Sequence, residues 1–268
     1  STTTKKTRRV VAAEVNKGVQ GAAALLRTRL VRYYSNSMPQ KLPIAAMVFD
    51  MDGLLLDSER RSQEVLHIAA TRIGKPLSPE VMLGMVGRNV HDGPRYLEQH
   101  LGSKALVGDL LVHYGELYNE EVAQGRIPVK TGVLEVLATL DELKIPRAIA
   151  TSTITSIATR KLERKALLAR FDAVIGGDQV QNGKPAPDIY LKACATLGQD
   201  PKLAWACEDS PAGIEAAATA GLRAILVPDL IAPTERMVSF AWRVAADLHE
   251  VGEILRAEAA VVRVTPTR

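Results

Sequence analysis

The sequence contains no apolar stretch long enough to cross a membrane, which a helical span would need about 20 residues to do. It has only two cysteines, Cys194 and Cys207, and their spacing matches no metal-ligand motif. A disulfide framework is therefore not expected, and both residues are predicted to be buried free thiols in a reducing compartment. Internal repeats and low-complexity runs are also missing, and the composition is that of an ordinary globular protein.

Acidic residues are scarce at the start of the chain. Residues 1–37 hold eight Lys/Arg and one acid, Glu14, which gives +7, whereas the remainder holds 26 Lys/Arg and 29 Asp/Glu, which gives −3. The net charge of +4 therefore belongs to this basic leader and not to the body of the chain. A nucleic-acid-binding function of the whole molecule loses its support, because the body is slightly acidic.

The leader is rich in Arg, Ser and Thr, and these are the traits of a transit peptide. Two alternatives remain open: non-native residues that precede a start at Met38, and a basic amphipathic helix over residues 9–32. We expect the catalytic unit to lie outside the leader. A cytoplasmic location is expected, or a mitochondrial one if residues 1–37 are a native targeting segment.

Apolar runs and helical patterns alternate from Leu42 onward, and such alternation is typical of a parallel sheet with helices on both faces. We predict an α/β fold with a doubly wound, Rossmann-like parallel sheet. The predicted strands are 44–50, 146–151, 172–176, 203–208, 223–227 and a short one at 243–246. The predicted helices between them are 131–143, 155–168, 187–197 and 211–220.

About 95 residues separate the first predicted strand from the second, far more than a strand–helix–strand crossover needs. The sequence in this gap is helical in pattern, so we predict an inserted all-helical cap that could close over a site. The expected division is a leader at 1–37, a core at 38–57 and 128–268, and a cap at 58–127. The helices predicted in the cap are 59–73, 78–85, 89–101 and 103–124.

Two carboxylates, Asp50 and Asp52, follow the first predicted strand directly, and Gly53 comes next. Ligands bind at the carboxyl ends of strands in open α/β sheets. Two acids side by side there are unfavourable unless a positive group lies between them. The motif therefore predicts a site for a divalent metal and a phosphate group; the alternative is a solvated turn with two incidental acids.

The second predicted strand ends at Thr151 and Ser152, where hydroxyls and backbone N–H groups could bind an anion or simply cap the next helix. Farther along, Lys184 lies in the stretch Gly-Lys-Pro-Ala-Pro-Asp. The two prolines stiffen this loop, so the lysine is expected to bind phosphate from a rigid tether. The alternative for Lys184 is an ordinary exposed loop lysine.

A second acidic pair, Glu208 and Asp209, ends another apolar strand and precedes Ser210-Pro211. The alternative is that Asp209 or Ser210 only caps the following helix. Capping alone does not explain two acids at the end of so apolar a strand. Oxygen ligands from two different strands suit Mg²⁺, which binds a few carboxylates together with water and phosphate oxygens.

These four segments, in this order and spacing, resemble the motifs of the haloacid dehalogenase superfamily over about residues 44–250. The helical insertion resembles the C1-type cap, and the chain is similar to the β-phosphoglucomutase-like and sugar-phosphate or nucleotide phosphatase group. The phrases that carry this likeness are Phe-Asp-Met-Asp-Gly-Leu-Leu-Leu-Asp-Ser-Glu, Gly-Lys-Pro-Ala-Pro-Asp and Glu-Asp-Ser-Pro-Ala-Gly-Ile-Glu-Ala-Ala.

The resemblance implies a Mg²⁺-dependent phosphatase that hydrolyses a small phosphomonoester through an aspartyl-phosphate on Asp50. It implies that Asp52 is the general acid and base. The metal would be bound by the backbone carbonyl of Asp52 and by the carboxylates of Asp50 and Asp209, with Glu208 nearby or bound through water. The residues implied to bind phosphate or substrate are Gly53, Thr151, Ser152, Lys184 and Arg88. Arg88 lies in the cap stretch Gly87-Arg88-Asn89, and a surface arginine is the alternative there.

The mutases of this group resemble one another in a histidine near the cap hinge, where this chain has Ser58-Glu-Arg-Arg-Ser-Gln-Glu64. This departure favours hydrolysis over mutase activity. Arg60 and Arg61 could favour an anionic or polyhydroxyl substrate, or they could form a solvated face.

Two other functional classes stay open at this point. One is a phosphonate or dehalogenase-type enzyme on the same scaffold, of which the dehalogenases would not need Glu208 and Asp209. A non-catalytic interaction protein would not need all four motifs. The expected partner is a small phosphate ester, with neither nucleic acid nor, for the core, a membrane; the oligomeric state is left open.

Overall fold

The computed structural model describes residues 44–85 and 92–262. Within these residues six strands form one parallel sheet in the order β3-β2-β1-β4-β5-β6. The predicted α/β, Rossmann-like fold is confirmed, and each predicted strand is present with slightly narrower limits. The strands are β1 (Ala46–Phe49), β2 (Arg147–Ala150), β3 (Ala173–Ile175), β4 (Ala204–Glu208), β5 (Arg223–Leu226) and β6 (Arg243–Val244).

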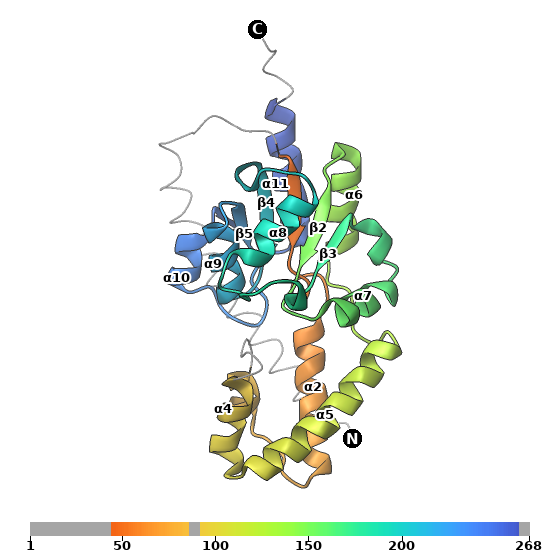
Figure 1. Ribbon diagram of the computed structural model, residues 1–268, viewed down its shortest axis with the longest axis vertical. Helices are drawn as coiled ribbons and strands as arrows, with labels where there is room; N and C mark the ends of the chain where they lie inside the picture. The colour runs from red at the N-terminus through yellow and green to blue at the C-terminus, as the bar shows by residue number, and fades with distance from the viewer. Residues whose placement is uncertain (1–43, 86–91, 263–268) are drawn as a thin grey trace.

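Helices cover both faces of the sheet, as Figure 1 shows. The predicted core helices are present, and two further helices, α10 and α11, follow β5 and β6. The core helices are α6 (Val133–Leu143), α7 (Thr155–Glu163), α8 (Asp188–Thr196), α9 (Pro211–Thr219), α10 (Glu235–Phe240) and α11 (Leu248–Val262). Short 3₁₀ turns lie at η1 (Leu168–Arg170), η2 (Gly177–Gln179) and η3 (Pro201–Leu203).

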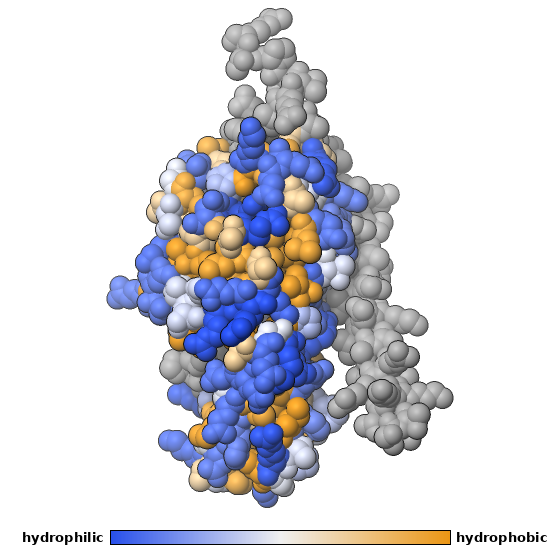
Figure 2. Space-filling model, turned by 90° about the vertical axis from the view of Figure 1, so that its right-hand side faces the viewer, coloured by the Kyte–Doolittle hydropathy of each residue, from blue (hydrophilic) through white to orange (hydrophobic). Residues whose placement is uncertain are grey.

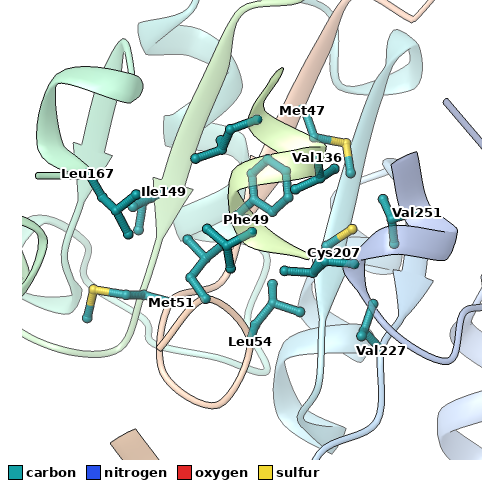
Figure 3. Packing of buried hydrophobic residues seen from close by; sticks show 14 of the residues in the cluster. Met47, Phe49, Met51, Leu54, Val136, Ile149, Leu167, Cys207, Val227 and Val251 are labelled. Atoms are coloured by element: carbon teal, nitrogen blue, oxygen red, sulfur yellow. The ribbon is translucent and has the colours of Figure 1, made fainter. Parts of the chain in front are cut away.

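The two faces of the sheet bury side chains of different size. Met47 and Phe49 of β1 point to the face covered by α6, α7 and α11, where a cluster of large apolar residues lies (Figure 3). Ala46 and Val48 point to the opposite face, which is rich in alanine and packs against α8, α9 and α10. This alternation follows from the two-residue period of a strand, and the absence of polar residues in β1 follows from burial on both faces.

The long insertion between β1 and β2 is helical in the described residues and lies below the sheet in Figure 1. It has a hydrophobic cluster of its own, which includes Leu66, Leu97 and Leu110. On the face shown in Figure 2, hydrophilic residues form a band between this part and the core above it. The helices are α2 (Ser58–Arg72), α3 (Pro79–Gly84), α4 (Asp92–Leu101) and α5 (Lys104–Ala123).

The chain enters and leaves the insertion side by side. The Asp57 N–H donates to the Pro128 carbonyl at 2.9 Å, and the Lys130 N–H donates to the Leu55 carbonyl at 2.9 Å. The last turns of α5 also reach the core, because Val122 belongs to the large-residue cluster of the sheet. The limits 58–127 for the cap remain a prediction. None of the described helices has both the length and the apolar character of a membrane span.

Candidate active site

The site lies where the sheet reverses its order. Strand β1 is flanked by β2 on one side and by β4 on the other, so later strands are added outward in both directions from this point. Phe49 is in register with Cys207, and the Asp50 N–H donates to the Cys207 carbonyl at 3.0 Å. Consequently Asp50 and Glu208 emerge together at the carboxyl edge, where open α/β sheets bind ligands.

Lys184 lies between these two acids. Its Nζ is 2.5 Å from Asp50 Oδ1 and also donates to Glu208 Oε1, and its side chain is buried. The Ala186 N–H closes the surrounding turn onto the Gly183 carbonyl at 3.0 Å. Burial alone would lower the pKa of Lys184, but the charges of Asp50 and Glu208 raise it overall and keep the ammonium charged. The structure therefore excludes the alternative that Lys184 is an ordinary exposed lysine of a loop.

The carboxylate of Asp50 is itself in an unfavourable environment. Burial raises its pKa well above the usual range, Lys184 lowers it, and the charges of Glu208 and Asp52 raise it further. A nucleophilic carboxylate must be ionised. One lysine is thus insufficient to neutralise this group of acids, and a second positive charge is needed.

Both carboxylate oxygens of Glu208 have partners. Oε1 accepts from Tyr190 Oη at 2.6 Å and from Lys184, and Oε2 accepts from Ser210 Oγ at 3.1 Å. The carboxylate lies against the first turn of α9, since a Cβ on Gly213 would be 1.9 Å from Glu208 Oε1. Tyr190 comes shortly after the Gly183–Asp188 stretch, but only the structure shows that its hydroxyl donates a hydrogen bond to Glu208.

Asp209 differs from Glu208 in its partners. Its Oδ1 is buried without a hydrogen-bond partner, and its pKa is raised well above the usual range by burial and by the nearby charges of Asp50 and Glu208. The helix cap is supplied by Ser210, whose Oγ accepts from the Gly213 N–H at 3.0 Å. Asp209 is therefore not the capping residue.

The donor set fits a divalent cation. Asp50, Glu208 and Asp209 each offer a carboxylate oxygen, and these atoms lie within 4.8 Å of one another. The unpartnered Asp209 oxygen and the raised pKa values of Asp50 and Asp209 are both relieved by a cation with hard oxygen ligands. Gly53 leaves room for this arrangement: its φ is +86°, and a Cβ there would be 2.3 Å from Asp209 Oδ2.

Asp52 is held by Lys161 of α7 and by two threonines that lie between β2 and α7. Lys161 Nζ donates to its Oδ1 at 2.7 Å, while Thr153 Oγ1 at 2.6 Å and Thr151 Oγ1 at 3.3 Å donate to its Oδ2. Burial would raise the pKa of Asp52, but Lys161 and the Thr153 hydroxyl outweigh burial and hold it below the usual range. Asp52 is thus ionised in this arrangement.

The three hydroxyl residues that follow β2 differ in which way their side chains face. Thr151 is buried and faces Asp52, as does Thr153, whereas the side chain of Ser152 is exposed. The N-cap of α7 is Ile154, which makes no side-chain cap hydrogen bond. The alternative that Thr151 or Ser152 caps this helix is therefore wrong, and the role of Ser152 in phosphate binding remains a prediction.

Both arginines at the cap hinge are paired with acids. Arg60 donates to Asp57 and Asp229 at 2.7 Å each, and Arg61 pairs with Glu121 and Glu64. They bind neighbouring acids of the protein, and a contact of either arginine with substrate remains a prediction. Arg88 lies outside the described residues.

Lys161 and Thr153 were not among the predicted site residues. The signal for Lys161 is its position: it shares the buried stripe of α7 with Ala158 and Leu162, where an apolar residue is the rule. Glu59 is a further acid near the site, because burial and the charge of Asp52 raise its pKa.

Comparison with known proteins agrees with this geometry. The family model described as haloacid dehalogenase-like hydrolase matches residues 47–227. The phosphorylated carbohydrates phosphatase of Thermotoga maritima is 35% identical over 183 residues, which cover 67% of this chain and 83% of that protein. A Drosophila melanogaster protein named "Probable pseudouridine-5'-phosphatase" is 31% identical over 212 residues, or 75% of this chain and 88% of that protein.

Among solved structures, CbbY from Rhodobacter sphaeroides in complex with phosphate is 26% identical, with a TM-score of 0.64. The match covers 78% of this chain and 96% of that chain. Fold, motif order and family model thus agree, and the chain belongs to the haloacid dehalogenase-like hydrolase family.

Proposed function

We propose that this hydrolase is a Mg²⁺-dependent phosphatase that cleaves small phosphomonoesters, either sugar phosphates or nucleoside monophosphates. The observation that carries the proposal is that Asp50 is hydrogen-bonded to the Lys184 ammonium and also lies in a cluster of carboxylates with the unpartnered oxygen of Asp209. A carboxylate that attacks a phosphate dianion needs more than one positive charge beside it; Lys184 supplies one, and a cation held at Asp209 would supply the other. The relatives named for phosphorylated carbohydrates and for pseudouridine-5'-phosphate support the two substrate classes.

Asp50 acts as the nucleophile. Its carboxylate oxygen bonds to phosphorus, the bond from phosphorus to the ester oxygen breaks, and an aspartyl-phosphate forms. Lys184, already hydrogen-bonded to Asp50 Oδ1, holds the phosphoryl oxygens beside the nucleophile. Thr151, which follows β2 directly and is buried beside Asp52, is the other residue assigned to the phosphoryl group.

Asp52 handles the protons. In the first step the protonated form of Asp52 gives its proton to the departing ester oxygen and becomes a carboxylate. In the second step this carboxylate takes a proton from water as the water oxygen bonds to phosphorus and the bond from phosphorus to Asp50 breaks, which returns Asp50 and releases inorganic phosphate. The hydrogen bonds from Lys161 and Thr153 favour its ionised form, which is the form that activates water. Asp50, Asp209 and the Asp52 carbonyl would hold Mg²⁺, with Glu208 behind them. The ion would supply positive charge against the phosphoryl group.

The test is hydrolysis of p-nitrophenyl phosphate, with EDTA and then with added Mg²⁺. We expect activity to vanish in EDTA and to return with Mg²⁺, and Asp50→Asn to retain less than about a tenth of wild-type kcat, a loss of more than about 1.4 kcal/mol. A fully active chelated enzyme would overturn the metal assignment. A panel of sugar phosphates and nucleoside monophosphates then decides between the substrate classes.

The mutase alternative has its own assay. β-Glucose 1-phosphate is supplied, and glucose 6-phosphate and inorganic phosphate are followed together. We expect phosphate release to dominate, because the hinge stretch Ser58–Glu64 contains no histidine to serve as a base. Faster formation of glucose 6-phosphate than of phosphate would replace the phosphatase with a mutase.

A further inference from the structure

Lys161 is a buried lysine outside the four sequence motifs. It lies on α7, its side chain is 4% exposed, and its Nζ donates to Asp52 Oδ1 at 2.7 Å. A buried ammonium is unfavourable unless it is paired and hydrogen-bonded. The position is part of the apolar stripe of α7, where methionine or leucine would meet the needs of packing alone. A lysine at this position therefore calls for an explanation beyond packing.

Hydrogen bonds to both oxygens hold the Asp52 carboxylate in one direction. Oδ1 is bound by Lys161, and Oδ2 is bound by Thr153 and Thr151. These three donors come from residues 151–161, which follow β2 and include most of α7, so they hold the carboxylate from a part of the chain remote from its own motif. A carboxylate bound on both oxygens cannot rotate freely about its side-chain torsions.

Lys161 also contacts the cap. Its Nζ lies 5.2 Å from the centroid of the Tyr118 ring, which belongs to α5. Tyr118 stacks on Tyr114 at 5.5 Å between centroids with an interplanar angle of 16°. The Tyr114 hydroxyl is 2.8 Å from Ser62 Oγ on α2. One continuous series of contacts thus runs from both long cap helices to Lys161.

We propose that Lys161 is a positioning residue that aims the Asp52 carboxylate, and that Tyr118 of the cap acts on Asp52 through Lys161. The proposal rests on the role of Asp52 as the acid/base in the proposed phosphatase. It explains why a charged residue occupies a buried stripe position, and why an aromatic pair of the cap points at the core helix α7. Glu59, the other acid near Lys161, lies on the cap side of the same contacts.

Two substrates distinguish a misoriented Asp52 carboxylate from a general loss of activity. An alkyl phosphate such as glycerol 3-phosphate has a poor leaving group and depends on the proton from Asp52, whereas p-nitrophenyl phosphate has a good one and depends on it little. In Lys161→Met we expect kcat for the alkyl phosphate to fall about 10–100-fold and kcat for the aryl phosphate to fall less than about 3-fold. Lys192→Met is the matched control, because Lys192 is exposed and donates only to the Gln179 carbonyl.

Tyr118→Leu removes the ring contact and should shift the alkyl-to-aryl ratio in the same direction. If Tyr118 acts through Lys161, the double variant should be no worse than Lys161→Met alone. Additive losses would overturn the coupling. Should Lys161→Met fail to fold, Lys161→Arg keeps the positive charge in a different geometry, and an unchanged alkyl-to-aryl ratio in it would overturn the positioning role.

The two proposals fail in different ways. If wild type hydrolyses neither ester, the phosphatase assignment fails first. If wild type hydrolyses both esters but a folded Lys161→Met loses both equally, or neither, only the positioning role of Lys161 is wrong.

Discussion

Asp209 is the residue at which function and stability oppose each other most directly. Its Oδ1 is buried and unpartnered beside the charges of Asp50 and Glu208, and nothing in the fold requires a carboxylate there. Such a group is kept at a cost in folding free energy, because it prepares the site for a cation. Stability measured with and without metal therefore tests the site independently of activity.

In Asp209→Asn we expect the free energy of unfolding in EDTA to rise by about 1–2 kcal/mol, because the wild type must protonate or bury the Asp209 carboxylate when it folds and an asparagine avoids that cost. We expect the stabilisation by Mg²⁺ to be largely lost; in wild type it should reach about 2.7 kcal/mol at a hundred times the dissociation constant. Thermal unfolding with EDTA and with Mg²⁺ measures both effects. A variant that keeps the full wild-type response to Mg²⁺ would contradict the placement of Asp209 at the metal.

The same acids predict how the stability of the metal-free protein depends on pH. The pKa values of Asp50 and Asp209 are raised in the folded state, so the folded state binds more protons than the unfolded state above about pH 4, the usual range of an aspartate. Stability should then fall as pH rises. Asp52 has a lowered pKa, and its contribution is lost only as pH falls through the acid range.

Melting temperatures in EDTA should therefore decrease from pH 5 to pH 8. Saturating Mg²⁺ should flatten this slope, because the bound ion favours the ionised carboxylates. A metal-free slope of the opposite sign would show that Asp50 and Asp209 are ionised in the folded protein at pH 5.

Helix α9 leaves space for the Glu208 carboxylate because it has a glycine, Gly213, at the point of contact. Gly213 lies in its first turn, where a Cβ would be 1.9 Å from Glu208 Oε1, an oxygen already held by Tyr190 and Lys184. The glycine allows a strand-end carboxylate and a helix N-terminus to pack directly together, which also suits the positive end of the helix dipole.

In Gly213→Ala we expect the free energy of unfolding to fall by about 1–3 kcal/mol, because the buried carboxylate loses hydrogen bonds when it is displaced. Gly108→Ala is the matched control in α5, where the added Cβ meets nothing within 4 Å. That change should stabilise the protein by about 0.5–1 kcal/mol. Urea unfolding measures the free energy of unfolding of both variants. Equal changes in this free energy at the two positions would contradict the close packing at Gly213.

At the level of elements, the sequence predicts what depends on local pattern. The uninterrupted apolar runs identify the strands, and the acids that follow β1 and β4 predict which edge carries the site. Helix α11 carries the periodic signal at Leu248, Val251 and Leu255, yet it is absent from the predicted elements, as is α10.

Lys161 could not be predicted as readily. It stands in a charged stretch with Arg160, Glu163 and Arg164, which is typical of an exposed helix face. Its partner Asp52 is distant in the sequence, and the packing of α7 against β3 and α5 brings the two together. The role of Tyr190 on α8 is hidden for the same reason, since its partner Glu208 lies at the end of β4.

At the level of the whole molecule, ion pairs connect the two crossings between the core and the insertion. Asp229, which follows β5, accepts from Arg60 at 2.7 Å and from Lys130 at 2.5 Å, so one core carboxylate binds both crossings. The hydrogen bond between Asp57 and Pro128 lies at the same place. The insertion is thereby tethered beside the carboxyl edge of the sheet, where the site lies.

The basic leader is predicted to lie outside this catalytic unit. A chain that starts at Met38 should keep its fold and its kcat, because the charge changes sign near this residue and every site residue follows it. The full chain and the chain that starts at Met38 can be compared by soluble yield, circular dichroism and turnover. Loss of soluble protein or of turnover would show that residues 1–37 pack on the core.

The position of β1 in the sheet has a consequence for how the molecule acquires its structure. β1 is a central strand, yet Val48 is in register with Ala148 on one side and with Ala206 on the other, and both partners come much later in the chain. During synthesis β1 leaves the ribosome long before either neighbour, with an apolar surface that nothing yet covers. Pairings of this sequence separation form slowly and expose such strands to aggregation. The arrangement that brings Asp50 to Glu208 thus makes the chain dependent on protection until β4 has been made.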